Sequence, residues 1–222
     1  MHVVVIVLAA LLALLMFGKY QRDAKRRVLA RSTVFDDCIG LLQQAQISQD
    51  KANLPVLNGQ YAGYKISLNI VEDTLGWRKL PPLWLLVKVV ANKPTIGSLD
   101  IIMRPANNEF YSPSWQWDGN LTIPTNWPQH AIIKYLHKPI DISLLQHIVP
   151  SLFSDLKMKE LLIMPEFVRL TYMAKQADRG EYLIMRNAVY DNIPIDKKIV
   201  EVIIKQAIEI RQILEKTQLS AK

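Results

Sequence analysis

The sequence contains a single cysteine, Cys38, among 222 residues. One thiol cannot form an intramolecular disulfide, so the chain does not belong with the small secreted domains that disulfides hold together. Cys38 directly follows Asp36 and Asp37, and neighbouring negative charge raises the pKa of a thiol and makes the thiolate scarcer. We therefore interpret Cys38 as a structural residue on a helix rather than a nucleophile.

Glycine is also scarce, and the motifs of common chemistries are missing. The eight glycines are scattered, so the phosphate-binding patterns GxxxxGK[ST] and GxGxxG cannot be written. No GxSxG, HExxH or CxxC occurs. Apart from His2, the histidines are His130, His137 and His147, and their spacing matches no zinc motif. The sequence therefore predicts no catalytic, cofactor-binding or metal-binding residues.

A long apolar run does occur, at the start of the chain. Residues 3–18 hold no charged side chain. A cleavable secretory signal needs a basic segment before its apolar core and small residues at the cleavage site, and this run has neither. Because Lys19 and Tyr20 can reach the headgroup level, a helix here can cross the roughly 30 Å hydrocarbon core of a bilayer. We predict a transmembrane anchor at residues 1–18, with a cleaved or re-entrant segment as the alternative.

Positive charge is concentrated directly after this run. Residues 19–31 carry six basic residues against one acid, which leaves only +2 of the net charge of +7 for the rest of the chain. These basic residues, called the collar below, are Lys19, Arg22, Lys25, Arg26, Arg27 and Arg31. Basic residues beside a span are retained on the cytoplasmic side, and they attract anionic lipids. The collar predicts membrane lipids as partners rather than nucleic acid, an external N-terminus and a cytoplasmic C-terminal domain, at the inner membrane if the source is bacterial.

The rest of the chain divides into a stalk and one domain. Residues 19–46 contain no proline and one glycine, so we expect the membrane helix to continue to about Gln46 and a linker to follow. This assigns residues 19–54 to a basic juxtamembrane helical stalk and linker. Residues 55–222 have the length of a single domain, and the chain's 50 % apolar content supports a packed core.

The first half of this domain is expected to be sheet. Apolar and polar residues alternate over residues 64–70 within a predicted strand at 61–71, the period of a strand with one solvated face. Further strands are expected at 83–91 and 98–104. The runs 114–117 and 120–123 flank an Asp-Gly pair, which is a strong hairpin signal. Successive runs of this kind predict antiparallel pairing.

The second half mixes helices and strands. Residues 142–155 are expected to be helical but divided by Pro150, and 158–164 and 167–174 to form a tight hairpin. A strand is expected at 181–189. The last element, from about Asp196 to Gln218, is an amphipathic helix whose stripe is Val200, Ile203, Ala207, Ile210 and Leu214. The predicted fold class is α+β, with six to eight mainly antiparallel strands and helices on one face.

Two groups of residues are candidates for recognition of a ligand or partner. Trp115 and Trp117 lie two apart on a predicted strand and would share one face, and Trp is common at the centre of interfaces. Asp178 and Arg179 share a polar loop between two predicted strands. A core role for the tryptophans and a structural ion pair for the loop residues are the simpler interpretations.

Two functional classes remain. The first is a single-pass membrane protein with a cytoplasmic binding or scaffolding domain for an unknown protein partner or lipid headgroups, in which the last helix packs on its own domain or also forms a homodimer. The second is a membrane-attached hydrolase or transferase acting on a lipid-linked substrate, with Asp178, Arg179 and one histidine in a pocket. A concave pocket holding ionisable side chains within hydrogen-bond reach would favour the enzyme.

Overall fold

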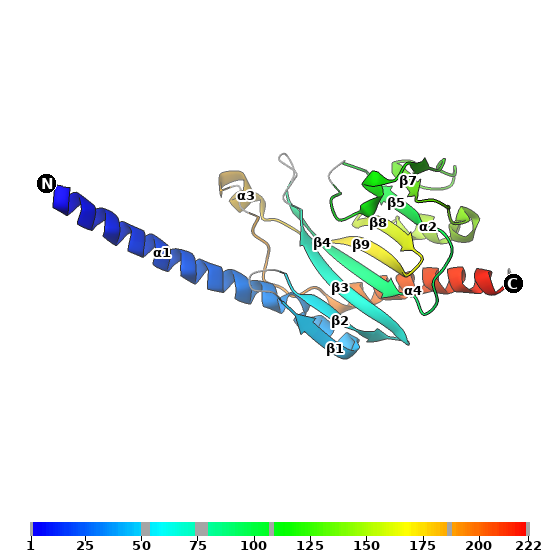
Figure 1. Ribbon diagram of the computed structural model, residues 1–222, viewed down its shortest axis with the longest axis horizontal. Helices are drawn as coiled ribbons and strands as arrows, with labels where there is room; N and C mark the ends of the chain where they lie inside the picture. Colours follow the sequence, from blue (N-terminus) through cyan, green and yellow to red (C-terminus); the bar gives the residue numbers. More distant parts are fainter. Residues whose placement is uncertain (1, 50–53, 74–79, 107–108, 186–187, 221–222) are drawn as a thin grey trace.

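The computed structural model describes residues 2–49, 54–73, 80–106, 109–185 and 188–220. Within these ranges it contains a long N-terminal helix, a nine-stranded antiparallel sheet and a long C-terminal helix (Figure 1). The helices are α1 (His2–Ser32), α2 (Ile148–Leu152), α3 (Arg179–Met185) and α4 (Lys197–Ser220). Shorter 3₁₀ helices are η1 (Thr33–Leu41), η2 (Pro113–Gln116) and η3 (Ile142–Leu145). The α+β fold class predicted from the sequence is confirmed.

The sheet has the strand order β1-β2-β3-β4-β9-β8-β5-β7-β6, and each pair of neighbours is antiparallel. The strands are β1 (Gln43–Ser48), β2 (Val56–Tyr61), β3 (Tyr64–Glu72), β4 (Pro82–Val90), β5 (Leu99–Met103), β6 (Gly119–Asn120), β7 (Ala131–Tyr135), β8 (Met158–Met164) and β9 (Phe167–Gln176). The β8–β9 hairpin predicted across Pro165-Glu166 is present, and its two strands lie at the middle of the sheet.

One face of the sheet is covered by helices. α4 packs on β4 and β9, and Figure 1 shows it running along the sheet. The predicted stripe of α4 is buried, with each of its five side chains at most 4 % exposed. Residues of η1 and α2 belong to the same hydrophobic core. The prediction that helices cover one face and that the last helix lies on the sheet is therefore correct.

A buried arginine fastens α4 to the sheet. Arg211 is fully buried and forms an ion pair with Glu215, with 2.9 Å between Nε and Oε1. Its guanidinium also donates to the hydroxyl of Thr95, at 3.2 Å, and to the carbonyl of Lys93. These two acceptors lie in the connection between β4 and β5, so Arg211 holds that connection against the helix.

The helical stalk is shorter than predicted. α1 ends at Ser32, η1 follows, and residues 43–48 form the edge strand β1 beside β2. The prediction of a helix to about Gln46 is therefore wrong from Gln43 onward, and the sheet begins before residue 55, where the sequence analysis placed the start of the domain. The physical reason is burial: Phe35 in η1 is fully buried in the core, which stops the chain from continuing as a free helix.

Cys38 is one of the residues that η1 places in this core. Its thiol is buried and donates to the carbonyl of Ile195 at 3.4 Å. Burial, and then the charges of Asp37 and Asp196, raise the pKa of the thiol to about 11. The interpretation of Cys38 as a structural thiol agrees with this position, in a 3₁₀ helix instead of an α-helix.

The predicted strand at residues 61–71 is the end of one strand and most of the next. β2 and β3 form a hairpin in which Tyr61 pairs with Tyr64. The two turn residues, Ala62 and Gly63, have φ of 49° and 80°, as a two-residue type I′ turn requires. Alanine rarely adopts this conformation, so the sequence carried only a weak turn signal here.

Two other strand predictions are wrong. Residues 114–117 are not a strand, because Ser112 caps the 3₁₀ helix η2 with a hydrogen bond from the amide of Ser114. Gly119 instead pairs with Tyr135 in β7, and a Cβ at Gly119 would lie 2.6 Å from the Tyr135 ring. Residues 181–185 belong to α3, which begins with the amide of Tyr182 bonded to the carbonyl of residue 178. The rest of the predicted strand at 181–189 lies partly outside the described residues.

Candidate functional site

The structure separates the recognition residues that the sequence suggested. Trp115 in η2 is 68 % exposed, whereas Trp117 is buried at 6 %, so the two rings do not share a face. Asp178 and Arg179 are exposed at the start of α3, which Figure 1 places far from β7. None of these four residues lines the pocket described next.

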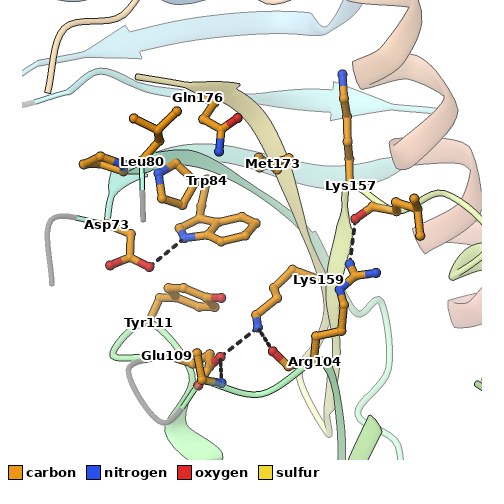
Figure 2. Close-up of a pocket in the computed structure, with 14 residues that line it drawn as sticks. Asp73, Leu80, Trp84, Arg104, Glu109, Tyr111, Lys157, Lys159, Met173 and Gln176 are labelled. Carbon is orange, nitrogen blue, oxygen red and sulfur yellow. Dashed lines mark hydrogen bonds and ion pairs between the residues drawn. The ribbon is translucent and has the colours of Figure 1, made fainter. Parts of the chain in front are cut away.

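A concave pocket lies on the sheet face opposite α4. Its volume is about 310 Å³, within the usual range for small-molecule sites. Figure 2 shows charged and aromatic side chains bordering it from β4, β8 and the segments after β3 and β5, with the Lys157 side chain extending away from Arg104. Those that matter most below are Asp73, Trp84, Arg104, Glu109 and Lys159.

Two β-bulges border this pocket. In β8 the register shifts between Met158 and Glu160, so Lys159 is an extra residue with no partner in β9. A second shift, between Leu83 and Trp84, leaves an extra residue in β9. Bulges are common beside functional sites, where they redirect a side chain. Here the first bulge directs Lys159 to the pocket while Met158 remains in the core on the other face.

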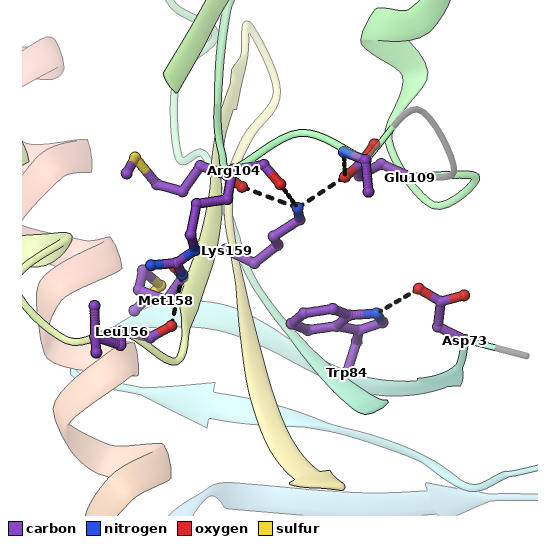
Figure 3. A network of polar contacts seen from close by, with 9 residues as sticks. Asp73, Trp84, Arg104, Glu109, Leu156, Met158 and Lys159 are labelled. Atoms are coloured by element: carbon purple, nitrogen blue, oxygen red, sulfur yellow. Dashed lines mark hydrogen bonds and ion pairs between the residues drawn. The ribbon is translucent and has the colours of Figure 1, made fainter. Parts of the chain in front are cut away.

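The buried side chain of Lys159 links β8 to the end of β5 and the segment after it at the base of the pocket. Its ammonium forms an ion pair with Glu109 at 2.7 Å and donates to the carbonyls of Met103 and Arg104 at 2.9 and 2.8 Å (Figure 3). These three acceptors use all three donors of the ammonium. Burial alone would raise the pKa of Glu109, but hydrogen bonds from Lys159 and from the amide of Ala106 outweigh it and hold this pKa below its usual value.

Arg104 lines the pocket with a strained backbone. Its φ is 45°, in the left-handed region that costs a residue other than glycine about 1–3 kcal/mol. Three contacts impose this conformation: its amide donates to His130, its carbonyl accepts from Lys159, and its guanidinium donates to the carbonyl of Leu156 at 2.6 Å. Strain of this kind tends to persist where the side chain is needed, and Arg104 is an exposed cation of the pocket lining.

Aromatic rings and a carboxylate form the opposite end. Trp84 donates from Nε1 to Asp73 at 3.3 Å. Tyr111 lies against Trp84, with ring centroids 5.9 Å apart. Burial, and then nearby carboxylates, raise the pKa of Tyr111 far above its usual value. The pocket therefore has a cationic end and an end that combines an indole with a carboxylate.

A buried polar cluster lies on the same sheet face, in β5, β8 and β9. Glu160 accepts two hydrogen bonds from Arg169, at 3.0 and 2.9 Å, and one from Thr171 at 2.5 Å. Asp100 accepts from Ser112 at 2.6 Å. Burial, and then repulsion from Glu160, raise the pKa of Asp100 to about 8. Asp100 is therefore largely protonated at neutral pH, which leaves Glu160 and Arg169 as a balanced pair.

We expect this proton to make the domain less stable as pH rises. An unfolded Asp has a pKa of about 3.9, so between about pH 4 and pH 8 the folded state holds a proton that the unfolded state has released. The free energy of unfolding then falls with rising pH, by up to about 1.4 kcal/mol per pH unit. Asp100→Asn should remove this contribution and flatten the dependence. Denaturant unfolding at about pH 5 and about pH 8 measures the free energy of unfolding at each pH. If this free energy falls between the two pH values by the same amount in the variant and in the wild type, the assignment is wrong.

The pocket is better suited to binding than to proton transfer. It does hold ionisable side chains within hydrogen-bond reach, the feature that would favour an enzyme. However, Lys159 and Glu109 neutralise each other, and the pKa values of Glu109 and Tyr111 are shifted away from neutrality, whereas a general acid or base works best near the operating pH. Among the described residues, no three His, Cys, Asp or Glu side chains gather as a metal site.

The pocket lies near a point where α1 contacts the domain. The collar residue Arg31 forms an ion pair with Glu72 at 2.9 Å, and the next residue, Asp73, lines the pocket. Lys19 and Arg22 are exposed, while the side chains of Lys25, Arg26 and Arg27 lie outside the described part of the chain. Through this ion pair, the collar residue Arg31 links α1 to β3 of the domain.

The sequence analysis missed this pocket because its residues come from separate segments. One signal was present: Lys159 and Glu160 are adjacent charges inside the apolar strand β8. The described residues form an α+β domain with a pocket lined by charged and aromatic side chains, preceded by one helix, Val4–Arg22 in its apolar part, that is long and apolar enough to cross a membrane. No protein family model matches the chain, and a search of curated proteins finds no match.

Proposed function

We propose that this is a single-pass membrane protein whose α+β domain lies on the cytoplasmic side and binds a ligand in the pocket beside the membrane. The observation that carries the proposal is the apolar part of α1, Val4–Arg22, of which none is buried by the domain. A soluble protein would rarely leave so large an apolar surface uncovered. The collar that follows supplies the orientation, because basic residues stay on the cytoplasmic side.

Binding is favoured over catalysis by the state of the pocket's charged groups. The ion pair between Lys159 and Glu109 links two segments of the pocket lining, and Arg104, whose guanidinium donates to the carbonyl of Leu156, is held in place beside it. Both are features of a preorganised binding site. A hydrolase or transferase acting on a lipid-linked substrate remains the second hypothesis, supported by the position of the pocket at the end of the sheet where α1 joins.

Reversing the difference in basic charge between the two flanks of the membrane span should invert the membrane topology of part of the protein. Replacing Lys25, Arg26 and Arg27 by Gln and adding two Lys after Met1 moves the basic flank to the other end of the span, so we expect a detectable fraction with an external C-terminal domain. Protease added to the outside of spheroplasts or sealed cells measures the fraction, because it degrades an external domain and spares a cytoplasmic one.

The matched control replaces three basic residues of the domain, Lys65, Lys134 and Lys138, by Gln. These lie far from the span in sequence, where charge has little influence on orientation, so this variant should remain fully protected. A wild-type protein whose domain is digested from outside would contradict the proposed orientation, and release of the wild-type protein by alkaline carbonate would contradict the anchor.

A further inference from the structure

We propose that α3 is a second membrane contact, in which Leu183 enters the interface of the bilayer that α1 crosses and Arg179 lies at the lipid phosphates. This inference rests on the proposed function, because it takes α1 as the membrane span. Two observations carry it. α3 lies at the end of the domain from which α1 leaves (Figure 1), and its exposed face combines an apolar with a basic side chain.

The end of the sheet that α1 joins also holds the segment with α3. This end is formed by the last residues of β3 and β9 and by the first residues of β4. Arg31 in α1 forms its ion pair with Glu72, the last residue of β3. Just after α1, the carbonyl of Val34 accepts from the amide of Ile195, which follows α3 in the chain, at 3.0 Å. α1 and the segment with α3 therefore meet at the same end of the domain.

Hydrogen bonds fasten the base of the α3 segment to this end. The amide of Ala177 donates to the carbonyl of Pro81 at 2.9 Å, just before β4. The amide of Asp178 donates to the carbonyl of Val189 at 2.8 Å, which joins the residue before α3 to one that follows it. Figure 1 shows α3 as the part of the domain that lies furthest toward the N-terminal end of α1. α3 therefore projects from the domain in the direction of the membrane span.

The exposed face of α3 has the composition of a helix in a membrane interface. Arg179 and Leu183 are four residues apart and so lie on the same face of the helix. Both are exposed, Leu183 at 56 %, whereas Tyr182 is buried. In an interfacial helix, apolar side chains enter the boundary of the acyl chains while basic side chains remain at the headgroups. A single exposed leucine needs no explanation by itself, but its place beside a membrane span indicates what covers it.

The length of chain between the span and the domain brings α3 to the headgroups. Arg31 follows Arg22, the last residue of the apolar part of α1, by nine residues, which is about 14 Å along a helix. The headgroup region extends roughly 5–8 Å beyond the hydrocarbon core, so about 6–9 Å separate it from the level of Arg31. α3 has seven residues and a length of about 10 Å. A projection of this size covers the gap.

Site-specific fluorescence in vesicles tests the contact. The full chain with Leu183→Cys is labelled with nitrobenzoxadiazole, whose emission moves to shorter wavelength outside water, and is reconstituted into phosphatidylcholine vesicles. Cys38 is buried and burial raises the pKa of its thiol to about 11, so it should not react with the label. Lipids with a spin label near the headgroup quench a dye that lies in the interface. We expect both the shift to shorter wavelength and the quenching at position 183.

The matched control is Ile96→Cys. Ile96 is 68 % exposed and lies between β4 and β5, where the amide of Thr95 donates to the carbonyl of Pro165 in the β8–β9 turn. This turn is at the end of the sheet away from α1, so the dye should stay in water and unquenched. Equal quenching at the two positions, or none at either, would overturn the contact. A shift at position 183 without quenching would place the dye against protein and would overturn it as well.

A second variant tests whether Leu183 itself makes the contact. With the dye on Arg179→Cys, one helical turn earlier, adding Leu183→Glu should abolish the quenching, because a carboxylate opposes entry into the acyl boundary. Adding Leu183→Met, which keeps an apolar side chain, should preserve it. Both changes are at an exposed position and should leave the melting temperature nearly unchanged. Quenching that Leu183→Glu leaves unchanged would show that Leu183 is not the contact.

Flotation of the same vesicles separates this inference from the proposed function. A density gradient at alkaline pH shows whether α1 anchors the protein, since only an integral membrane protein floats with the lipid. Protein that floats but is not quenched at position 183 would overturn the α3 contact alone. Protein that does not float would overturn the anchor and, with it, the proposed function.

Discussion

Replacing Ile203 by Asp is expected to prevent the domain from folding. Ile203 is 2 % exposed in the stripe of α4 that packs on the sheet. A carboxylate at this position would lose its hydration with no buried partner, a cost of several kcal/mol, and the marginal stability of a domain is only about 5–15 kcal/mol. The milder Ile203→Ala should lower the free energy of unfolding by about 2–5 kcal/mol. Circular dichroism during thermal unfolding of the full chain measures both.

The neighbouring position provides the control. Val202 is 54 % exposed on the same helix, so Val202→Asp should leave the melting temperature nearly unchanged. A folded Ile203→Asp protein that merely changes from dimer to monomer in sedimentation would contradict the packing of α4, because the stripe would then be an interface between two copies.

Removing residues 1–49 should unfold the domain, whereas removing residues 1–32 should not. The longer truncation deletes η1 and β1, and with them four buried side chains of the core: Val34, Phe35, Cys38 and Leu42. Loss of a single large core side chain costs about 2–5 kcal/mol, so losing four exceeds what most domains can tolerate. Fragment 33–222 keeps all four and serves as the matched control.

Denaturant unfolding of the two fragments distinguishes these outcomes. Fragment 33–222 should unfold in one cooperative transition, and fragment 50–222 should show none, or a transition at much lower denaturant concentration. Coincident transitions would contradict the assignment of η1 and β1 to the domain core.

Elements with a strong local pattern were predicted correctly. In the stripe of α4, the apolar run of β4 and the β8–β9 hairpin, the spacing of apolar residues along the sequence indicates directly which side chains are buried. β1 was missed because its residues, Gln-Gln-Ala-Gln-Ile-Ser, are exposed except for the half-buried Ala45 and show no apolar alternation. α3 was predicted as a strand because a short apolar run does not distinguish helix from strand.

The pocket could not be predicted because its formation depends on long-range packing. Asp73 and Trp84 flank the β3–β4 connection, Arg104 and Glu109 follow β5, and Lys159 enters through a bulge in β8. A bulge shifts the alternation of a strand by one residue, and in β8 its mark in the sequence is the adjacent charged pair of Lys159 and Glu160. The positive φ of Arg104 likewise results from contacts with residues far along the chain.

Determining on which side of the membrane the C-terminal domain lies tests the proposed function most directly. Two reporters can be fused after Lys222, one that fluoresces only in a reducing cytoplasm and one that is active only after export. The collar and the uncovered apolar part of α1 predict fluorescence from the first and no activity from the second. Activity of the exported reporter, with loss of fluorescence from the cytoplasmic one, would contradict a cytoplasmic binding domain.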